Sequence, residues 1–320
     1  MSLRLVSNWL TYLMVRLFIC LVQAMRIETC HALARVLAFL ACDVVRLRHK
    51  VIDENLSHAF PDHSPDRRRK LARGMWEHLL LMVCEIAHVP RKIHETNWRD
   101  YIQLNDIAPQ VRCLLDRRPA VVLAGHFGNF EVGGYFLGLF GYPTFTIVRP
   151  LDNPFLQRFV NGFRQANGQQ VLPKRNIAQQ VADRLAEGQN LVILGDQYGG
   201  PKGCRINFFG RPASYNKAIA LFSLTSGAPI CIGYTRRLNR PLQFEMGVVG
   251  LFDPADESPN IRGASDLLQW YNDHLEQIVR MAPEQYWWLH RRWKERPVGK
   301  RRFIKARKSG VRSQGLEVRG

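Results

Sequence analysis

The chain has 320 residues, and its 45 lysines and arginines against 27 aspartates and glutamates give a formal net charge of +18. Hydrophobic residues make up 46% and charged residues only 22%, which excludes a disordered polyelectrolyte and a collagen-like fibre. The seven cysteines include no C-x-x-C pair, so neither a disulfide framework nor a zinc knuckle is predicted, and a reducing compartment is the simplest interpretation.

The N-terminal 25 residues form a long apolar stretch. Only Arg16 interrupts the uncharged run from Leu5 to Met25, whose length is close to the ~20 residues that span a bilayer core. Because a central arginine is costly in lipid, a helix lying on the membrane fits as well as a full span. A buried first helix of a soluble domain is a further alternative. We expect residues 1–26 to form a membrane-anchoring helix.

A helical region is predicted over residues 27–118. Apolar residues recur at helical spacing in 32–40 and 71–86, and the proline-bounded segment 61–65 separates these stretches. The Ser-Pro pair that ends this segment suits the start of the second helix.

Two Glu-x-x-His pairs, Glu28/His31 and Glu85/His88, share the spacing used in di-iron bundles. Such a site needs two further inward glutamates on an all-helical scaffold. We therefore expect polar pairs on helix surfaces, and no metal or cofactor.

Residues 119–295 alternate between strand-like and helix-like segments. The apolar, strand-like runs are 119–124, 144–148, 190–194, 228–234 and 244–249. The helix-like stretches are 130–140, 154–165, 177–187, 214–226 and 262–281. This alternation predicts an α/β fold with a mixed, mostly parallel sheet flanked by helices, behind the N-terminal helical, membrane-associated region.

The candidate catalytic segment is GHFGNFE at 125–131, which follows the first strand-like run directly. It contains His126 and Glu131, a histidine and an acid with four residues between them. Two other histidines, His49 and His290, share this spacing, but they lie in charged surroundings, and we expect them outside the site. Ligands bind at the carboxyl ends of strands in open α/β sheets, so His126 is the histidine in the favoured position.

The pair His126 and Glu131 suits general base catalysis. Five positions along a regular helix separate two side chains by about 140°, so the two groups meet only if the chain turns near Gly128 and Asn129. A neutral imidazole would then take a proton from a hydroxyl while the carboxylate fixes its tautomer. No serine or cysteine nucleophile lies nearby in the sequence, so the hydroxyl would belong to the substrate. A helix-capping or core histidine is the alternative.

Several segments, in order along residues 45–300, resemble the lipid A biosynthesis acyltransferases. This family of lauroyl and myristoyl transferases belongs to the wider lysophospholipid acyltransferase group. The matching segments are VIDENLSHAFP at 51–61, the 126–131 block, VRPLDNP at 148–154, GDQYGGPK at 195–202, FFGRPA at 208–213 and PEQYWWLHRR at 283–292.

The resemblance implies an inner-membrane enzyme whose catalytic domain faces the cytoplasm. The implied donor is an acyl-carrier-protein thioester, with acyl-CoA as an alternative, and the implied acceptor is a lipid A precursor. His126 would be the general base of the family's His-x4-acid dyad, with Glu131 as its partner. Tyr198 stands where members of the family often carry a second acid, so the acceptor can differ. Acylation of a lysophospholipid or of another glycolipid is the alternative within this class.

The remaining candidates for contacts with the substrate are charged side chains. Arginine fits phosphate by bidentate geometry, so we expect Arg149 to contact a phosphate or head group, followed by Arg164 and Lys202. Asp196 would orient an arginine or the sugar.

Two further features of the reaction are expected near the candidate histidine. The backbone N–H groups of Gly128 and Asn129 would stabilise the oxyanion. The aromatic side chains Phe127, Phe130, Phe136 and Phe140 are candidates for an acyl slot.

The C-terminal residues 291–320 carry twelve lysines and arginines against two acids, a net +10. A basic tail of this kind, over residues 296–320, gains about 1 kcal/mol per cation beside an anionic lipid surface, and we expect such a surface as a partner. The same charge leaves open a non-enzymatic, basic membrane- or nucleic-acid-binding protein. We expect no specific nucleic acid partner for the enzyme.

Overall fold

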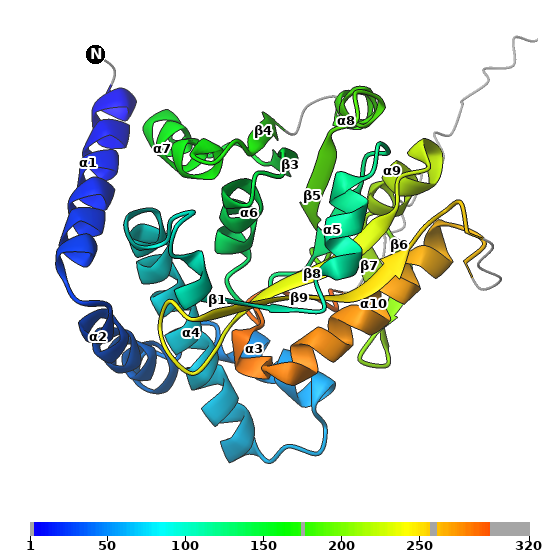
Figure 1. The fold of residues 1–320 in the computed structure, drawn as a ribbon. Coiled ribbons are helices and arrows are strands. Elements are labelled where there is room, and N and C mark those ends of the chain that lie inside the picture. Colours follow the sequence, from blue (N-terminus) through cyan, green and yellow to red (C-terminus); the bar gives the residue numbers. More distant parts are fainter. Residues whose placement is uncertain (1–2, 174–176, 257–260, 295–320) are drawn as a thin grey trace, which may run out of the picture.

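The computed structural model describes residues 3–173, 177–256 and 261–294. The predicted basic tail at 296–320 lies outside the described residues. Figure 1 shows a central twisted sheet with helices on both sides and the N-terminal helices along one flank.

The N-terminal part of the chain is helical, as the apolar spacing predicts. The helix α4 begins at Pro65, and the side chain of Ser64 accepts a hydrogen bond from the backbone N–H of Arg67, so the Ser-Pro pair caps this helix as expected. The elements are α1 (Leu3–Ala24), α2 (Ile27–Phe39), a π-helical turn (Leu40–Val44), α3 (His49–Ala59), α4 (Pro65–Lys92) and a 3-10 turn (Trp98–Asp100).

The main sheet has seven strands in the order β1-β9-β8-β2-β5-β3-β4. All neighbouring strands run parallel except β8 and β9, which are antiparallel. The mixed, mostly parallel sheet predicted from the sequence is confirmed. The strands are β1 (Ile102–Asn105), β2 (Val121–Ala124), β3 (Thr144–Val148), β4 (Gln170–Pro173), β5 (Asn190–Leu194), β8 (Ile230–Arg237) and β9 (Phe244–Phe252).

Helices cover both faces of this sheet because the central strands are apolar on both sides. In β2, Val121 and Leu123 pack with α8, α9 and α10, while Val122 packs with α5 and α6 on the opposite face. The helices are α5 (Ala108–Leu115), α6 (Phe130–Leu139), α7 (Pro154–Gln165), α8 (Ile177–Ala186), α9 (Ala218–Ser226) and α10 (Ala264–Met281), and a 3-10 turn (Pro283–Gln285) follows.

A separate antiparallel hairpin of β6 (Cys204–Phe208) and β7 (Arg211–Tyr215) was not expected. A helix is predicted from the sequence over 214–226, but β7 extends to Tyr215 and the helix begins at Ala218. The strands β1 and β4 were also missed, and β1 interrupts the region 27–118 that was predicted to be helical. Segments of four to eight residues are too short for their periodicity to distinguish a strand from a helix.

Candidate active site

The candidate site lies where two parallel neighbouring strands end together. The strands β2 and β5 pair in register, with Ala124 opposite Leu194. His126 and Asp196 each follow these partners by two residues, so the sheet brings them to the same edge although 70 residues separate them in the sequence. This is the edge at which open α/β sheets bind ligands.

His126 and Asp196 form a buried, doubly connected pair. The His126 Nδ1–H donates to Asp196 Oδ1 at 2.6 Å, and the backbone N–H of His126 donates to Asp196 Oδ2 at 2.9 Å. Only 8% of His126 and 3% of Asp196 are exposed. A carboxylate only accepts hydrogen bonds, so this contact places the proton of a neutral imidazole on Nδ1 and leaves Nε2 as a base.

The pair shifts both pKa values in the direction that favours ionisation. Burial by itself lowers the pKa of His126, but the charge and hydrogen bond of Asp196, with a smaller contribution from Glu131, raise it above its ordinary value. Burial alone raises the pKa of Asp196, yet the charge and hydrogen bonds of His126 lower it strongly, with help from the charge of Arg292. Asp196 is therefore a carboxylate at neutral pH.

Gln197 occupies the other side of the imidazole. Its side-chain Nε2 lies 3.1 Å from His126 Nε2, a contact that fits an amide N–H donating to the unprotonated ring nitrogen. Gln197 is not among the site residues predicted from the sequence. Its position next to Asp196, directly after an apolar strand, was the signal that could have found it.

Three aromatic rings surround His126. The ring centroids of Phe130, His290 and Trp287 lie 4.9, 5.6 and 5.7 Å from that of His126. The expectation that His290 lies outside the site is wrong, because the segment before the C-terminal tail folds back over the sheet edge, where Trp287 N–H donates to the His126 carbonyl. Burial, and then the neighbouring charge of His126, lower the pKa of His290, which therefore stays neutral beside the pair.

The expected direct pairing of His126 with Glu131 is wrong. Glu131 lies in the first turn of α6 and accepts hydrogen bonds from Arg164 of α7, at 2.5 Å from Nη2 and 3.0 Å from Nε. The helix begins immediately after the turn, so the carboxylate faces α7, and Asp196 takes the place beside the imidazole. Arg164 is correspondingly occupied by a carboxylate in the structure rather than free for a phosphate.

The turn at Gly128 and Asn129 does not leave its amides open. The Gly128 N–H donates to the Gln285 carbonyl at 2.9 Å and the Asn129 N–H to the Thr235 carbonyl at 2.8 Å. The oxyanion role expected for these two groups is therefore contradicted by their hydrogen bonds. Gly128 has φ +59° and a Cβ there would lie 2.0 Å from the Thr235 carbonyl oxygen, so the turn requires glycine.

A buried cluster of polar side chains from α4 and β8 contacts this turn. Glu85 of α4 is fully buried and accepts from both Arg237 and the Asn129 side chain. His78 accepts from Arg237 at Nδ1 and donates from Nε2 to the Gly128 carbonyl. Burial, and then the Arg237 charge, lower the pKa of His78 well below its ordinary value, so it remains neutral.

The two Glu-x-x-His pairs consequently differ from the expected helix-surface pairs. Glu85 belongs to the buried cluster, while His88 contacts the carbonyls of Cys84 and Met25. His31 pairs with Glu77 of α4 rather than with Glu28. Among the described residues, no group of three or more histidine, cysteine or acidic side chains could hold a metal ion.

Substitution Glu85→Ala should destabilise the protein by about 3–5 kcal/mol, because it leaves the buried Arg237 guanidinium without its counter-charge. Thermal unfolding of the full chain in detergent measures this loss. The matched control is Glu187→Ala, which removes an exposed ion pair with Arg184 and should cost about 0–1 kcal/mol. Equal stability of the two variants would contradict the role assigned to the cluster.

His126 borders a large cavity of about 620 Å³. Of the predicted site residues, His126, Glu131, Arg149 and Arg164 line it, and Gln197, which was not predicted, lines it as well. Lys202 is exposed and is not among the lining residues. Much of the remaining wall is aliphatic or aromatic: Ile147, Val148, Leu151, Val160, Ile177, Val192, Ile193, Leu194, Ala218, Ile219 and Phe222.

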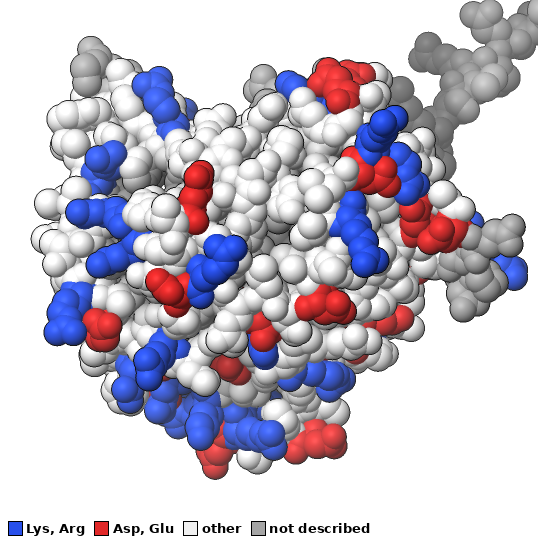
Figure 2. Space-filling model, viewed as in Figure 1, with Lys and Arg blue, Asp and Glu red and all other residues white. Residues whose placement is uncertain are grey.

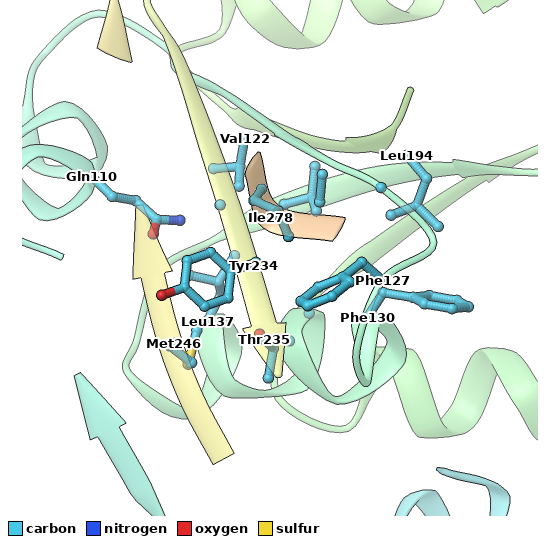
Figure 3. A pocket seen from close by; sticks show the side chains of 16 residues that line it. Gln110, Val122, Phe127, Phe130, Leu137, Leu194, Tyr234, Thr235, Met246 and Ile278 are labelled. Atoms are coloured by element: carbon cyan, nitrogen blue, oxygen red, sulfur yellow. The ribbon is translucent and has the colours of Figure 1, made fainter. Parts of the chain in front are cut away.

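A second, smaller space of about 50 Å³ lies on the other side of the same loop. Figure 3 shows Phe127, from the loop after β2, and Phe130, the first residue of α6, among the lining side chains, together with Thr235 of β8. Of the four aromatic candidates for an acyl slot, these two line the space, whereas Phe136 is fully buried in the core and Phe140 packs against Trp98. The larger cavity, of about 620 Å³, is the better candidate to hold a fatty acyl chain.

The sequence of the chain is similar to those of known proteins. A model of the bacterial lipid A biosynthesis acyltransferases matches residues 1–295. The chain is 26% identical over 298 residues to the lipid A biosynthesis lauroyltransferase of Escherichia coli K12, covering 91% of this chain and 93% of the relative. It is 25% identical over 267 residues to the lipid A biosynthesis palmitoleoyltransferase of the same organism, covering 81% of this chain and 83% of the relative. A lipid A biosynthesis acyltransferase of Haemophilus influenzae is 20% identical over 239 residues, covering 73% and 72% of the two chains.

Proposed function

The chain belongs to the bacterial lipid A biosynthesis acyltransferase family, and on this premise we propose that it transfers a fatty acyl group from an acyl-carrier-protein thioester to a hydroxyl of a lipid A precursor. The observation that carries the proposal is the buried His126–Asp196 pair at the edge of an apolar cavity large enough for an acyl chain. His126 is the general base and Asp196 the residue that positions it.

The chemistry follows from the protonation state of the pair. His126 Nε2 takes the proton of the acceptor hydroxyl as its oxygen attacks the thioester carbonyl carbon. Asp196 holds the proton on Nδ1 and stabilises the imidazolium that forms. The tetrahedral intermediate then collapses, the carbon–sulfur bond breaks, and the imidazolium returns its proton to the thiolate. The acceptor hydroxyl must displace the Gln197 amide from Nε2 to begin this sequence.

Glu131 acts at longer range than the sequence suggested. Its bidentate contact holds Arg164 against the cavity wall, and its negative charge adds to that of Asp196 in raising the pKa of His126. A head-group phosphate that reaches Arg164 would therefore meet an arginine already fixed in direction.

In the variant Glu131→Gln, the pKa of His126 should fall, because one of the charges that stabilise the imidazolium is gone. General base activity requires neutral His126, so the rising limb of kcat/KM against pH should move to lower pH. The shift should be smaller than in Asp196→Asn, since the Glu131 charge is the weaker of the two contributions. A pH profile that stays in place or moves upward would contradict this role.

Arg149 is the candidate contact for an acceptor phosphate. It follows β3, is exposed and lines the cavity. Removing a charge-assisted hydrogen bond costs about 1.5–3 kcal/mol, so Arg149→Ala should raise the KM for a phosphorylated acceptor roughly tenfold or more. The matched control is Lys202→Ala, an exposed cation outside the cavity wall, which should leave this KM unchanged. An equal KM increase in both variants would mean that the overall positive charge, rather than a contact made by Arg149, favours binding of the acceptor.

The N-terminal helix supports a membrane location for this chemistry. Within the described residues, α1 is the helix long and apolar enough to cross a bilayer. It packs against α7, whose residues Gln157, Val160 and Arg164 line the cavity. A lipid acceptor held in a membrane beside α1 would thus lie near the site. We place the enzyme at the inner membrane, with its catalytic body on the cytoplasmic side.

The proposed reaction is tested by incubating the purified full chain in detergent micelles with acyl-carrier-protein thioester and a phosphorylated lipid A precursor. The acceptor should gain the mass of one fatty acid less one water. Parallel incubations with acyl-CoA, and with lysophospholipid as the acceptor, test the alternatives. Acylation of lysophospholipid with no change in the lipid A precursor would overturn the proposed acceptor.

A further inference from the structure

The two N-terminal helices expose most of the large apolar side chains on the protein surface. Of the 24 exposed large hydrophobic residues described, 17 lie between Leu3 and Leu47. In α1 they include Leu10, Met14 and Leu17, which point away from the body. Scattered apolar residues are normal on soluble proteins, whereas a concentration of this kind marks a binding surface.

The opposite face of α1 is attached to the body along most of the helix. Half-buried or buried positions recur at helical spacing on this face and form a seam between α1 and the body. They include Asn8, Tyr12, Val15, Ile19 and Val22, of which Val22 is 3% exposed. At 1.5 Å per residue this seam extends over about 21 Å, most of the thickness of a bilayer core.

The seam is built mainly on α7. The side chain of Asn153, which caps α7, donates to the Asn8 carbonyl at 2.8 Å. The ring of Tyr12 lies 6.0 and 6.3 Å from those of Phe155 and Phe159. Further along α1, the Arg16 guanidinium lies 5.0 Å from the centre of the Phe159 ring.

The C-terminal end of α1 contacts α4. The Gln23 side chain donates to the Ala87 carbonyl of α4 at 2.8 Å. The helix α1 is therefore attached to the body near both of its ends.

These contacts conflict with a helix that crosses the bilayer. A crossing α1 would take α7 into the hydrocarbon region, although α7 carries polar side chains such as Gln157, Arg158 and Asn161. Charged and unpaired polar groups are expensive there. The contacts are compatible with α1 lying in the plane of the membrane, with α7 on its aqueous side and Arg16 held on the Phe159 ring.

The apolar surface continues into α2 and the following π-helical turn. The helix α2 packs on α4 through three small buried residues, Cys30, Ala34 and Ala38. Its other face and the π-helical turn expose Leu33, Val36, Leu37, Phe39, Leu40, Val44 and Val45. Figure 1 shows α1 and α2 one after the other along the same flank of the molecule, so their exposed faces form one surface.

Basic side chains accompany this surface. Arg26, Arg35, Arg46, Arg48 and Lys50 are all exposed. The acid Asp43 is already neutralised by Arg69 and Arg73. Figure 2 shows lysine and arginine side chains gathered on the lower and left parts of this face, where Figure 1 places α2, α3 and the start of α4. A cationic rim around an apolar face complements an anionic bilayer surface.

We infer that residues 3–47 dock the protein on one leaflet of an anionic phospholipid bilayer, with α1 and α2 lying in its interface and neither helix crossing it. The occupant of the apolar face is lipid rather than a second copy of the chain. The inference concerns docking alone and does not depend on the reaction proposed above.

The orientation of α1 is tested with the full chain carrying an N-terminal epitope tag, in sealed membrane vesicles from the producing cells. Protease added outside should remove the tag from the same vesicles in which it digests the body, because both lie on one side. Detergent-opened vesicles give the complete-digestion control. A tag that stays protected while the body is digested shows a crossing helix and overturns the inference.

The docking of α2 is tested with a photoreactive benzoylphenylalanine in place of Val36, in the full chain bound to vesicles of phosphatidylcholine and phosphatidylglycerol. The matched control places it at Leu115 of α5, which is 70% exposed against 57% for Val36. Irradiation should yield phospholipid adducts at Val36 and none above background at Leu115. Adducts to a second protein chain at Val36, or equal lipid labelling at both positions, overturn the inference. Acyl transfer is not a readout in either experiment.

Discussion

Substitution His126→Ala is expected to lower turnover by about 10²–10⁴-fold, the usual loss on removing a general base. The effect should appear in kcat and in kcat/KM alike, because the proton is transferred in the transition state. The variant keeps the hydrogen bond from the His126 backbone N–H to the buried Asp196 carboxylate but loses the one from the ring, so stability must be measured together with turnover. Steady-state kinetics with one assigned donor and acceptor measure the loss, and thermal unfolding verifies the fold.

The matched control for this substitution is His49→Ala. His49 is exposed at the start of α3 and does not line the catalytic cavity. His290 is unsuitable as a control, since its ring lies 5.6 Å from that of His126. A His126→Ala enzyme that keeps most of its kcat would remove the basis for a histidine general base.

The variant Asp196→Asn should lose up to about 10⁴-fold in turnover, the effect of an equivalent change in serine proteases. An asparagine amide can donate to Nδ1, which moves the imidazole proton to Nε2, where the base is needed. The same change should lower the pKa of His126, because the largest stabilising charge on the imidazolium is lost. The residual activity should therefore persist to lower pH than in the wild type.

A suitable control for Asp196→Asn is Asp183→Asn on the exposed face of α8, which should leave kinetics unchanged. The comparison with Glu131→Gln separates the two carboxylates. If Glu131→Gln has the larger effect on turnover and on the pH profile, then Glu131 rather than Asp196 is the functional partner of His126.

The central strands and the position of His126 could be predicted because both depend on local patterns. The runs that became β2, β3 and β5 are apolar and are followed by turns, and His126 stands directly after the first of them. A strand end is also where an open sheet binds its ligands, so one local observation placed the candidate base correctly at the cavity.

The partner of His126 could not be predicted, because it depends on the order of strands in the sheet. Asp196 is brought beside His126 only because β5 lies next to β2, and nothing in the two segments themselves specifies that pairing. The spacing of His126 and Glu131 suggested a local contact instead. The start of α6 at Phe130 turns Glu131 toward Arg164.

Long-range contacts also explain why the surroundings of Glu85 and His290 were predicted wrongly. Glu85 appeared as one of several polar residues on a helix, yet Arg237, 152 residues later, makes it the centre of a buried cluster. His290 was expected near the basic tail, but Asn55 of α3 donates to its carbonyl and helps to hold this segment over the site. Contacts of this separation leave no periodic signal in the sequence.

The most direct test of the account is mass spectrometry of the lipid A from cells that produce the wild-type chain and from cells that produce His126→Ala at the same level. The account predicts lipid A with one additional acyl group in the first cells and the unmodified precursor in the second. The same acylated lipid A in both, or an acyl group gained only by phospholipids, would contradict it.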